Sequence, residues 1–284
     1  MGDHDRQETR EQEDRAVCAI QLARARYREV VDQLAPPQPG SMLDLERAHT
    51  SREPLDTLVM AHRARATENL DRLFEMMLVD GSEQMFAYPY SQYSLIRTTV
   101  EAAATAMWLI QSSKKADRIL RALQLAYRNS QEALQFAELL KGKNAAGRAR
   151  AAEIRSTARL NELKNSVGPL RQVALTRPPR YTAILTAVSP KSGNRNIAGY
   201  AISSPLVVWK ISSAFLHGSE QVIRTLSEIR QIEEFTDGVA SFRITPNVQL
   251  LAVSIRTCVD LIADVDQRYG HLATHDYAGR PASN

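Results

Sequence analysis

The stretch SQYSLIRTTVEAAATAMWLI, residues 91–110, carries the clearest indication of the fold. Apolar side chains recur along it every three or four residues, at Ile96, Val100, Ala103 and Met107. That spacing is typical of a helix with one buried face. Its alanines favour the helix strongly and let a neighbouring helix approach closely. The stretch therefore predicts a helix that packs against other helices.

The same helical spacing continues on both sides of this stretch. Further helices are predicted, with approximate bounds, at residues 16–34, 53–79, 114–140, 145–165, 181–188, 204–235 and 245–270. Prolines stand at several of these boundaries, because proline cannot continue a helix but fits its first turn. No segment shows a sustained period-two alternation with turn glycines, so no sheet is expected. The fold predicted is all-α, a bundle of about seven to eight helices.

The proline-rich stretch APPQPG, residues 35–40, is the clearest linker in the chain. It ends a charged N-terminal helix, so residues 1–40 are predicted as a helix with a linker. Residues 41–275 are predicted to form one helical bundle domain, and residues 276–284 a tail.

Composition excludes several classes of protein. Hydrophobic residues make up 44% of the 284, enough for a globular core, and no apolar run approaches the ~20 residues of a membrane span. The charged N-terminus does not resemble a signal peptide. Cys18 and Cys258 are too isolated for a disulfide framework, and His271 with His275 lacks the glutamate of a helical metal motif. We expect a cytoplasmic protein with no membrane contact, metal or cofactor, since phosphate-cradle and nucleophile-elbow motifs are also absent.

The middle of the chain is basic. Residues 141–195 hold twelve basic and two acidic residues. Such asymmetry is typical of a nucleic-acid surface, but also of a solvated face that balances acidic helices elsewhere. No aromatic residue interrupts residues 141–180, so stacking on single strands is not indicated. The candidate nucleic-acid contacts are Lys141, Lys143, Arg148, Arg150, Arg155 and Arg159.

Arg97 and Glu101 lie beside the apolar line of the 91–110 helix, at the edge of its buried face. Charges in that position need partners. His62 and His217, each on or near an apolar stripe of another predicted helix, are placed to join them. One interpretation is a catalytic pocket: Arg97 holds a phosphate or carboxylate, His217 acts as general acid or base, and Glu101 orients them. The alternative is a buried network that fixes helix register and carries out no chemistry.

Residues 93–109 and 209–218 resemble a family of all-helical proteins from actinobacteria and their phages. In that family an Arg-x3-Glu helix ending in tryptophan precedes a Ser-Ala…His-Gly helix. The layout of residues 52–240 is also similar to HEPN domains, many of which are metal-independent ribonucleases of toxin or antiphage systems. This resemblance implies an all-α fold with a HEPN-like core.

The HEPN signature is an arginine followed by a histidine four to six residues later. His217 has only Lys210 upstream, and the formal match Arg268 to His275 falls at the C-terminal end. The sequence therefore departs from the signature, and Arg97 with His217 would have to form the equivalent pair in space.

Three functions follow as alternatives. The leading expectation is a non-catalytic interaction protein, with a homodimer through long helices or another protein as partner. The second is a HEPN-like ribonuclease or toxin that uses Arg97, Glu101 and His217. The third is a nucleic-acid-binding protein that acts through residues 141–195.

Overall fold

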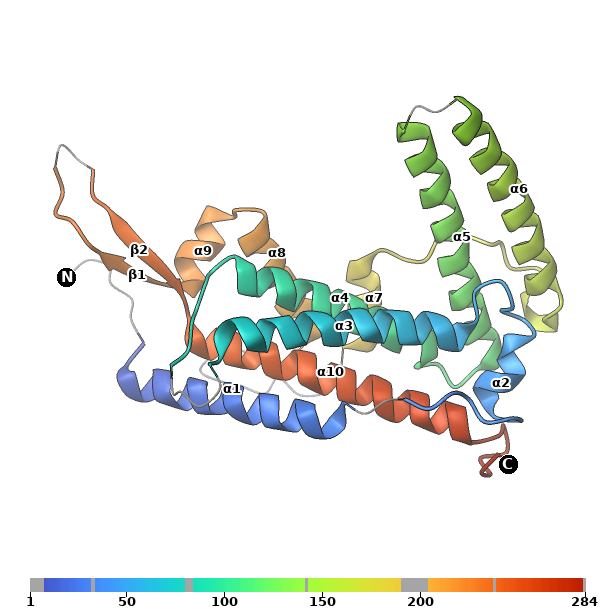
Figure 1. The fold of residues 1–284 in the computed structure, drawn as a ribbon, viewed down its shortest axis with the longest axis horizontal. Helices are drawn as coiled ribbons and strands as arrows, with labels where there is room; N and C mark the ends of the chain where they lie inside the picture. Colours follow the sequence, from blue (N-terminus) through green and yellow to red (C-terminus); the bar gives the residue numbers. More distant parts are fainter. Residues whose placement is uncertain are drawn as a thin grey trace. The chain divides into compact units, whose positions relative to one another are not determined.

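A computed structural model of the chain describes residues 8–31, 34–79, 84–140, 143–189, 204–236 and 239–282. Within these ranges it is predominantly helical, with one small sheet (Figure 1), so the predicted all-α bundle is confirmed. The helices are α1 (Arg10–Val30), α2 (Met42–Arg47), α3 (Leu55–Met77), α4 (Ser91–Ile110), α5 (Lys115–Leu139), α6 (Lys143–Asn165), α7 (Tyr181–Val188), α8 (Pro205–Leu216), α9 (Glu220–Leu226) and α10 (Val248–Thr274), with the 3-10 turn η1 (Gly168–Leu170) after α6.

The helix predicted over residues 204–235 is wrong beyond its first half. The helix α8 ends at Leu216, and Gly218 then adopts a φ of 67°, a left-handed conformation that glycine accommodates without a Cβ clash. After the short α9, the chain forms the strands β1 (Ser227–Gln231) and β2 (Phe242–Pro246). They pair antiparallel, with Ile229 opposite Ile244. The expectation of no sheet is therefore corrected to one hairpin.

Local caps explain where α1 begins. It starts at Arg10, earlier than the predicted residue 16, because Thr9 and Gln12 form a capping box. The Thr9 hydroxyl accepts from the Gln12 backbone N–H, and the Gln12 side chain accepts from the Thr9 N–H. The segment between the helices predicted at residues 181–188 and 204–235 lies mostly outside the described residues.

The chain divides into two compact units. Unit 1 comprises residues 1–32, 63–104 and 185–266, and unit 2 comprises residues 33–62, 105–184 and 267–284. The domain boundaries predicted from the sequence, at residues 40 and 275, remain a prediction.

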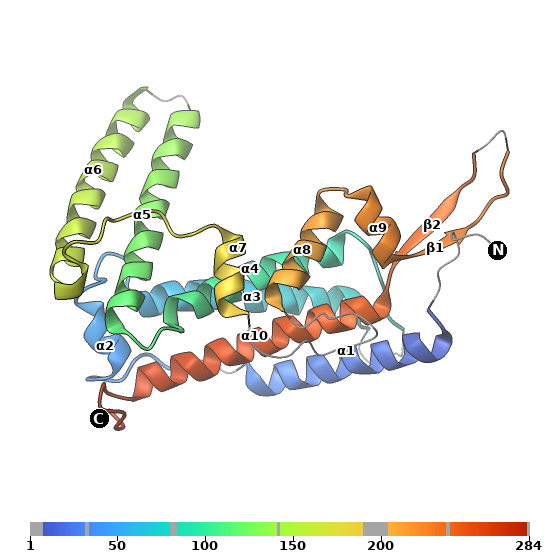
Figure 2. The ribbon, with the colours of Figure 1, turned by 180° about the vertical axis from the view of Figure 1, so that it is seen from behind.

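In unit 1, α4 and α8 lie side by side in both views (Figures 1 and 2). The stacked rings of Tyr93 and Phe215, with centroids 4.1 Å apart, join these two helices. The nearly buried guanidinium of Arg63 donates to both carboxylate oxygens of Asp266, each at 2.7 Å, and so joins α3 to α10. The ring pair brings α4 and α8 together, and the residues of the candidate site lie on these two helices.

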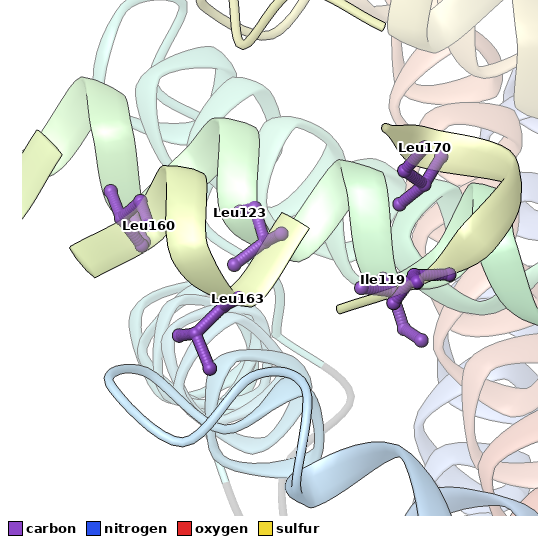
Figure 3. Packing of buried hydrophobic residues seen from close by; sticks show 7 residues of the cluster. Ile119, Leu123, Leu160, Leu163 and Leu170 are labelled. Atoms are coloured by element: carbon purple, nitrogen blue, oxygen red, sulfur yellow. The ribbon is translucent and has the colours of Figure 1, made fainter. Parts of the chain in front are cut away.

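Unit 2 contains the antiparallel helix pair α5 and α6 and the turn η1. Their buried side chains form one apolar cluster (Figure 3), and its members are Ile119, Leu123, Ala126, Leu160, Leu163, Val167 and Leu170. Lys164 lies beside this cluster, and its ammonium donates to the Val173 carbonyl at 2.6 Å. One of the basic side chains of the 141–195 segment is therefore structural.

Candidate functional site

The candidate site begins with an ion pair on α4. Arg97 and Glu101 are four residues apart and lie on one face of the helix. Arg97 Nε donates to Glu101 Oε1 at 3.0 Å, and the two side chains are 25% and 21% exposed. The pair thus lies at the edge of the core.

Trp209 of α8 fixes this pair from the neighbouring helix. Its indole Nε1 donates to the same Glu101 Oε1 at 2.6 Å. The Arg97 guanidinium lies over the indole ring, 5.5 Å from the ring centroid, in a cation–π contact. Because one carboxylate oxygen accepts from both side chains, Glu101 positions Arg97 relative to Trp209.

His217 completes the cluster at the exposed end of α8. It is the C-cap residue of that helix, and its Nε2 lies 3.4 Å from Arg97 Nη1. A guanidinium can only donate, so a hydrogen bond across this contact uses Nε2 as the acceptor, in an imidazole that carries its proton on Nδ1.

The spacing along α8 explains why these side chains share one face. Trp209, Ser213 and His217 follow one another at intervals of four residues, which is one helical line. The Ser213 hydroxyl is buried and has no hydrogen-bond partner within the described part of the chain. Trp209 and His217, two turns apart on this line, both contact Arg97.

This arrangement suits an anionic ligand. Arg97 Nε donates to Glu101, and its Nη1 lies beside the exposed His217. Guanidinium groups bind phosphate or carboxylate oxygens through paired N–H donors. A neutral imidazole beside that anion can accept a proton. Among the residues that the structure describes, no group of three or more His, Cys, Asp or Glu side chains could hold a metal ion.

The structure brings together Arg97, Glu101 and His217, the three predicted catalytic residues. Sequence reasoning missed Trp209 as a member of this cluster, although its spacing of two helical turns from His217 could have indicated it. The other histidine considered, His62, is buried on α3 and belongs to unit 2.

The predicted nucleic-acid contacts lie on α6, in unit 2. Lys141 lies outside the described residues, and the side chain of Lys143 does as well. Arg150 pairs with Glu138 at 3.2 Å and Arg159 with Glu162 at 2.8 Å, all four side chains exposed. Arg148 and Arg155 are also exposed, and neither has an ion pair in the ranges that the structure covers. These two arginines follow each other at seven residues, two turns along one face.

Comparisons with protein-family models, with curated proteins and with solved structures find no match to this chain. None of the helices in the described ranges combines the length and apolar character needed to cross a lipid bilayer.

Proposed function

We propose that the chain binds a phosphodiester at the Arg97–His217 pair and cleaves RNA there without a metal ion. The observation that supports this proposal is the 3.4 Å contact between two side chains that lie 120 residues apart in the sequence. An arginine and a histidine in contact can supply a positive charge and a proton acceptor, two elements that enzymes use to cleave RNA.

In the proposed reaction, Arg97 Nη1 donates to a phosphate oxygen in place of His217 Nε2, and the freed Nε2 accepts the proton of a ribose 2′-hydroxyl. The 2′-oxygen then bonds to the adjacent phosphorus while the bond to the 5′-oxygen breaks. The products are a 2′,3′-cyclic phosphate and a 5′-hydroxyl, which takes its proton from solvent. Arg97 stabilises the charge that develops on the phosphate oxygens. Glu101 and Trp209 are positioning residues, because they contact Arg97 and not the phosphate.

The test is cleavage of a fluorescent single-stranded RNA in the presence of a chelator. We expect His217→Gln and Arg97→Ala each to lower the rate by roughly a hundredfold or more, the usual contribution of one acid–base or charge-stabilising group. The matched controls are His271→Gln and Arg15→Gln, since both side chains are exposed and lie outside the cluster. Cleavage that survives in His217→Gln would remove this histidine from the reaction.

The second candidate is a non-catalytic interaction protein. The favouring observation is that Arg97 and Glu101 neutralise each other and that Glu101 also accepts from Trp209. Such a network can fix the register of α4 against α8 without any ligand. If wild-type protein does not cleave RNA while Glu101→Gln destabilises it, this second candidate replaces the first.

Binding of nucleic acid through α6 is compatible with either candidate. Arg148 and Arg155, exposed and without an ion pair among the described residues, would contact phosphates. We also propose, from the sequence alone, that the protein is cytoplasmic.

A further inference from the structure

Three aromatic side chains are exposed in the segment that leads into α4. Phe86, Tyr88 and Tyr90 are 45%, 49% and 52% exposed, whereas Ala87 and Pro89 between them are partly buried. This alternation is typical of an extended chain, in which every second side chain points to the same side. In the described ranges, no stacking or cation–π contact involves these three rings. They form an exposed aromatic row.

The backbone beneath the aromatic row is fixed by a buried glutamine. Gln92 Nε2 donates to the Phe86 carbonyl at 2.7 Å, and Gln92 Oε1 accepts from the Tyr88 N–H at 3.0 Å. The Phe86 N–H donates to the Met77 carbonyl at the end of α3, at 2.9 Å. The ring of Pro89 fixes its own φ. Because this backbone is already ordered, a ligand that stacks on the rings loses little conformational entropy of the protein on binding.

The aromatic row ends at the helix that carries the candidate site. The Tyr90 carbonyl accepts from the Ser94 N–H at 3.0 Å, so Tyr90 begins the first turn of α4. Arg97 follows seven residues later, which is two turns and about 10 Å along the helix axis. Tyr90 therefore lies at the end of the same helix face that carries Arg97.

The helix α8 brings His217 to this end of α4. The two helices run antiparallel, because Phe215 contacts Tyr93 near the start of α4 while Trp209 contacts Glu101 further along it. In both views the chain enters α4 beside the turn from α8 into α9 (Figures 1 and 2). The aromatic row and the exposed imidazole of His217 thus lie at the same end of the α4–α8 pair, within unit 1.

We propose that the aromatic row binds the bases of a single-stranded RNA whose phosphate lies at Arg97 and His217, an inference that rests on the proposed function. Every base has a face that stacks on an aromatic ring, so such binding tolerates any sequence. Tyrosine suits this contact because its ring stacks while its hydroxyl stays hydrated.

The spacing of the rings favours a single strand over a duplex. Side chains two residues apart in an extended segment are separated by about 7 Å, roughly twice the 3.4 Å between successive nucleotides of a duplex strand. The aromatic row therefore fits bases that have separated from one another. The substrate class that follows is unpaired RNA of any sequence, held by its bases next to the phosphate that reacts.

Fluorescence anisotropy of a labelled 2′-O-methyl RNA, about 12 nucleotides long, tests this with the full chain. The probe keeps bases and phosphates but has no free 2′-hydroxyl, so binding is measured without cleavage. We expect Tyr88→Leu and Tyr90→Leu each to raise the dissociation constant roughly tenfold, the usual loss for one stacked base, while Tyr88→Phe keeps the wild-type value. The matched control is Phe235→Leu, because Phe235 is 58% exposed but contacts Phe242 of the hairpin. Unchanged affinity in both leucine variants overturns the proposal, as does a duplex that binds as tightly as the single strand.

A second measurement detects the stacking itself. The base analogue 2-aminopurine loses fluorescence when it stacks on an aromatic ring, so the wild-type chain should quench a probe that contains it. The double variant Tyr88→Leu, Tyr90→Leu should quench it much less at saturating protein, whereas binding through charge alone would leave the two chains equal and overturn the proposal. Unmodified RNA then separates the two hypotheses. If RNA is cleaved but quenching does not depend on the tyrosines, the proposed function stands and the aromatic row is not its binding site. If quenching depends on the tyrosines and RNA is never cleaved, the stacking site stands and the reaction is wrong.

Discussion

The fully buried ion pair in unit 2 yields the sharpest stability prediction. Glu46 of α2 and Arg118 of α5 are both completely buried, and the guanidinium donates to both carboxylate oxygens of Glu46. Arg118 also donates to the Ser112 carbonyl at 2.6 Å, and the Tyr277 hydroxyl donates to Glu46. Burial, followed by the hydrogen bond to Glu46, raises the pKa of Tyr277 above its usual range. Glu46→Gln keeps the size of the side chain and removes its charge.

Removing one partner leaves the arginine buried without a counter-charge, which costs about 3–5 kcal/mol. Glu162→Gln makes the same chemical change in an ion pair with Arg159 whose side chains are 56% and 64% exposed. An exposed pair contributes about 0–1 kcal/mol, so the two variants should differ by about 3 kcal/mol in the free energy of unfolding. In the double variant Glu46→Gln, Arg118→Met the loss should be smaller than the sum of the two single losses, since no unpaired charge remains.

Urea unfolding followed by tryptophan fluorescence measures this difference. Trp108 belongs to unit 2 and Trp209 to unit 1, so Trp209→Phe leaves a single reporter in the unit that contains the ion pair. With a slope of about 2 kcal/mol/M, the midpoint should fall by roughly 1.5 M in Glu46→Gln relative to Glu162→Gln. Equal midpoints in the two variants would refute the reasoning, because they would mean that Arg118 reaches water or another anion.

Three further predictions concern the backbone, the histidines and α6. Gly218→Ala should destabilise the chain by about 1 kcal/mol, the cost of the left-handed φ of 67° alone, since no neighbouring atom lies within 4 Å of the added Cβ. Gly147→Ala in the helix α6 should instead stabilise the chain slightly, and thermal melts compare the two variants. Burial lowers the pKa of His49 and of His271, so the folded chain binds their protons less readily than the unfolded chain, and the urea midpoint should fall as the pH decreases through about 6.5. That decrease should be smaller in the variant His49→Gln, His271→Gln, and an unchanged profile would contradict the prediction. Replacing Arg148 and Arg155 by glutamine should reduce the slope of log K against log salt concentration for RNA binding by about 1.4. The same change at Arg72, which is exposed and paired with Glu75, should leave this slope unchanged.

The helices were predictable because a buried face repeats its apolar residues over several turns. The helix α4 is the clearest case, since Ile96, Val100 and Ala103 are all fully or almost fully buried. The short α2 carries too few turns for such a repeat, and its start depends on the Ser41 hydroxyl, which accepts from the Asp44 N–H. The hairpin was missed because each strand contributes only one or two large apolar residues to its face. The long connection between β1 and β2 also lacks the two-residue turn that marks most hairpins.

The candidate site was predictable in part for a related reason. Arg97 and Glu101 were identified from one helix, because their position beside its apolar line requires partners. His217 was identified from its own predicted helix, but the contact between the two helices depends on packing that no local pattern encodes. That packing includes the ring pair of Tyr93 and Phe215. A contact across 120 residues is a property of the tertiary structure.

The order of side chains along α8 separates positioning from chemistry. Trp209 lies partly buried near the start of the helix and contacts both members of the α4 ion pair, while His217 lies exposed at its end. Trp209→Phe removes the N–H donated to Glu101 but keeps an aromatic ring beneath Arg97. If Arg97 acts on a phosphate, this variant should lower kcat through a misplaced guanidinium and leave the pH dependence of the reaction unchanged. His217→Gln should abolish that pH dependence, because the proton acceptor itself is lost. If both variants only lower stability and RNA is never cleaved, the cluster joins two helices and carries out no reaction.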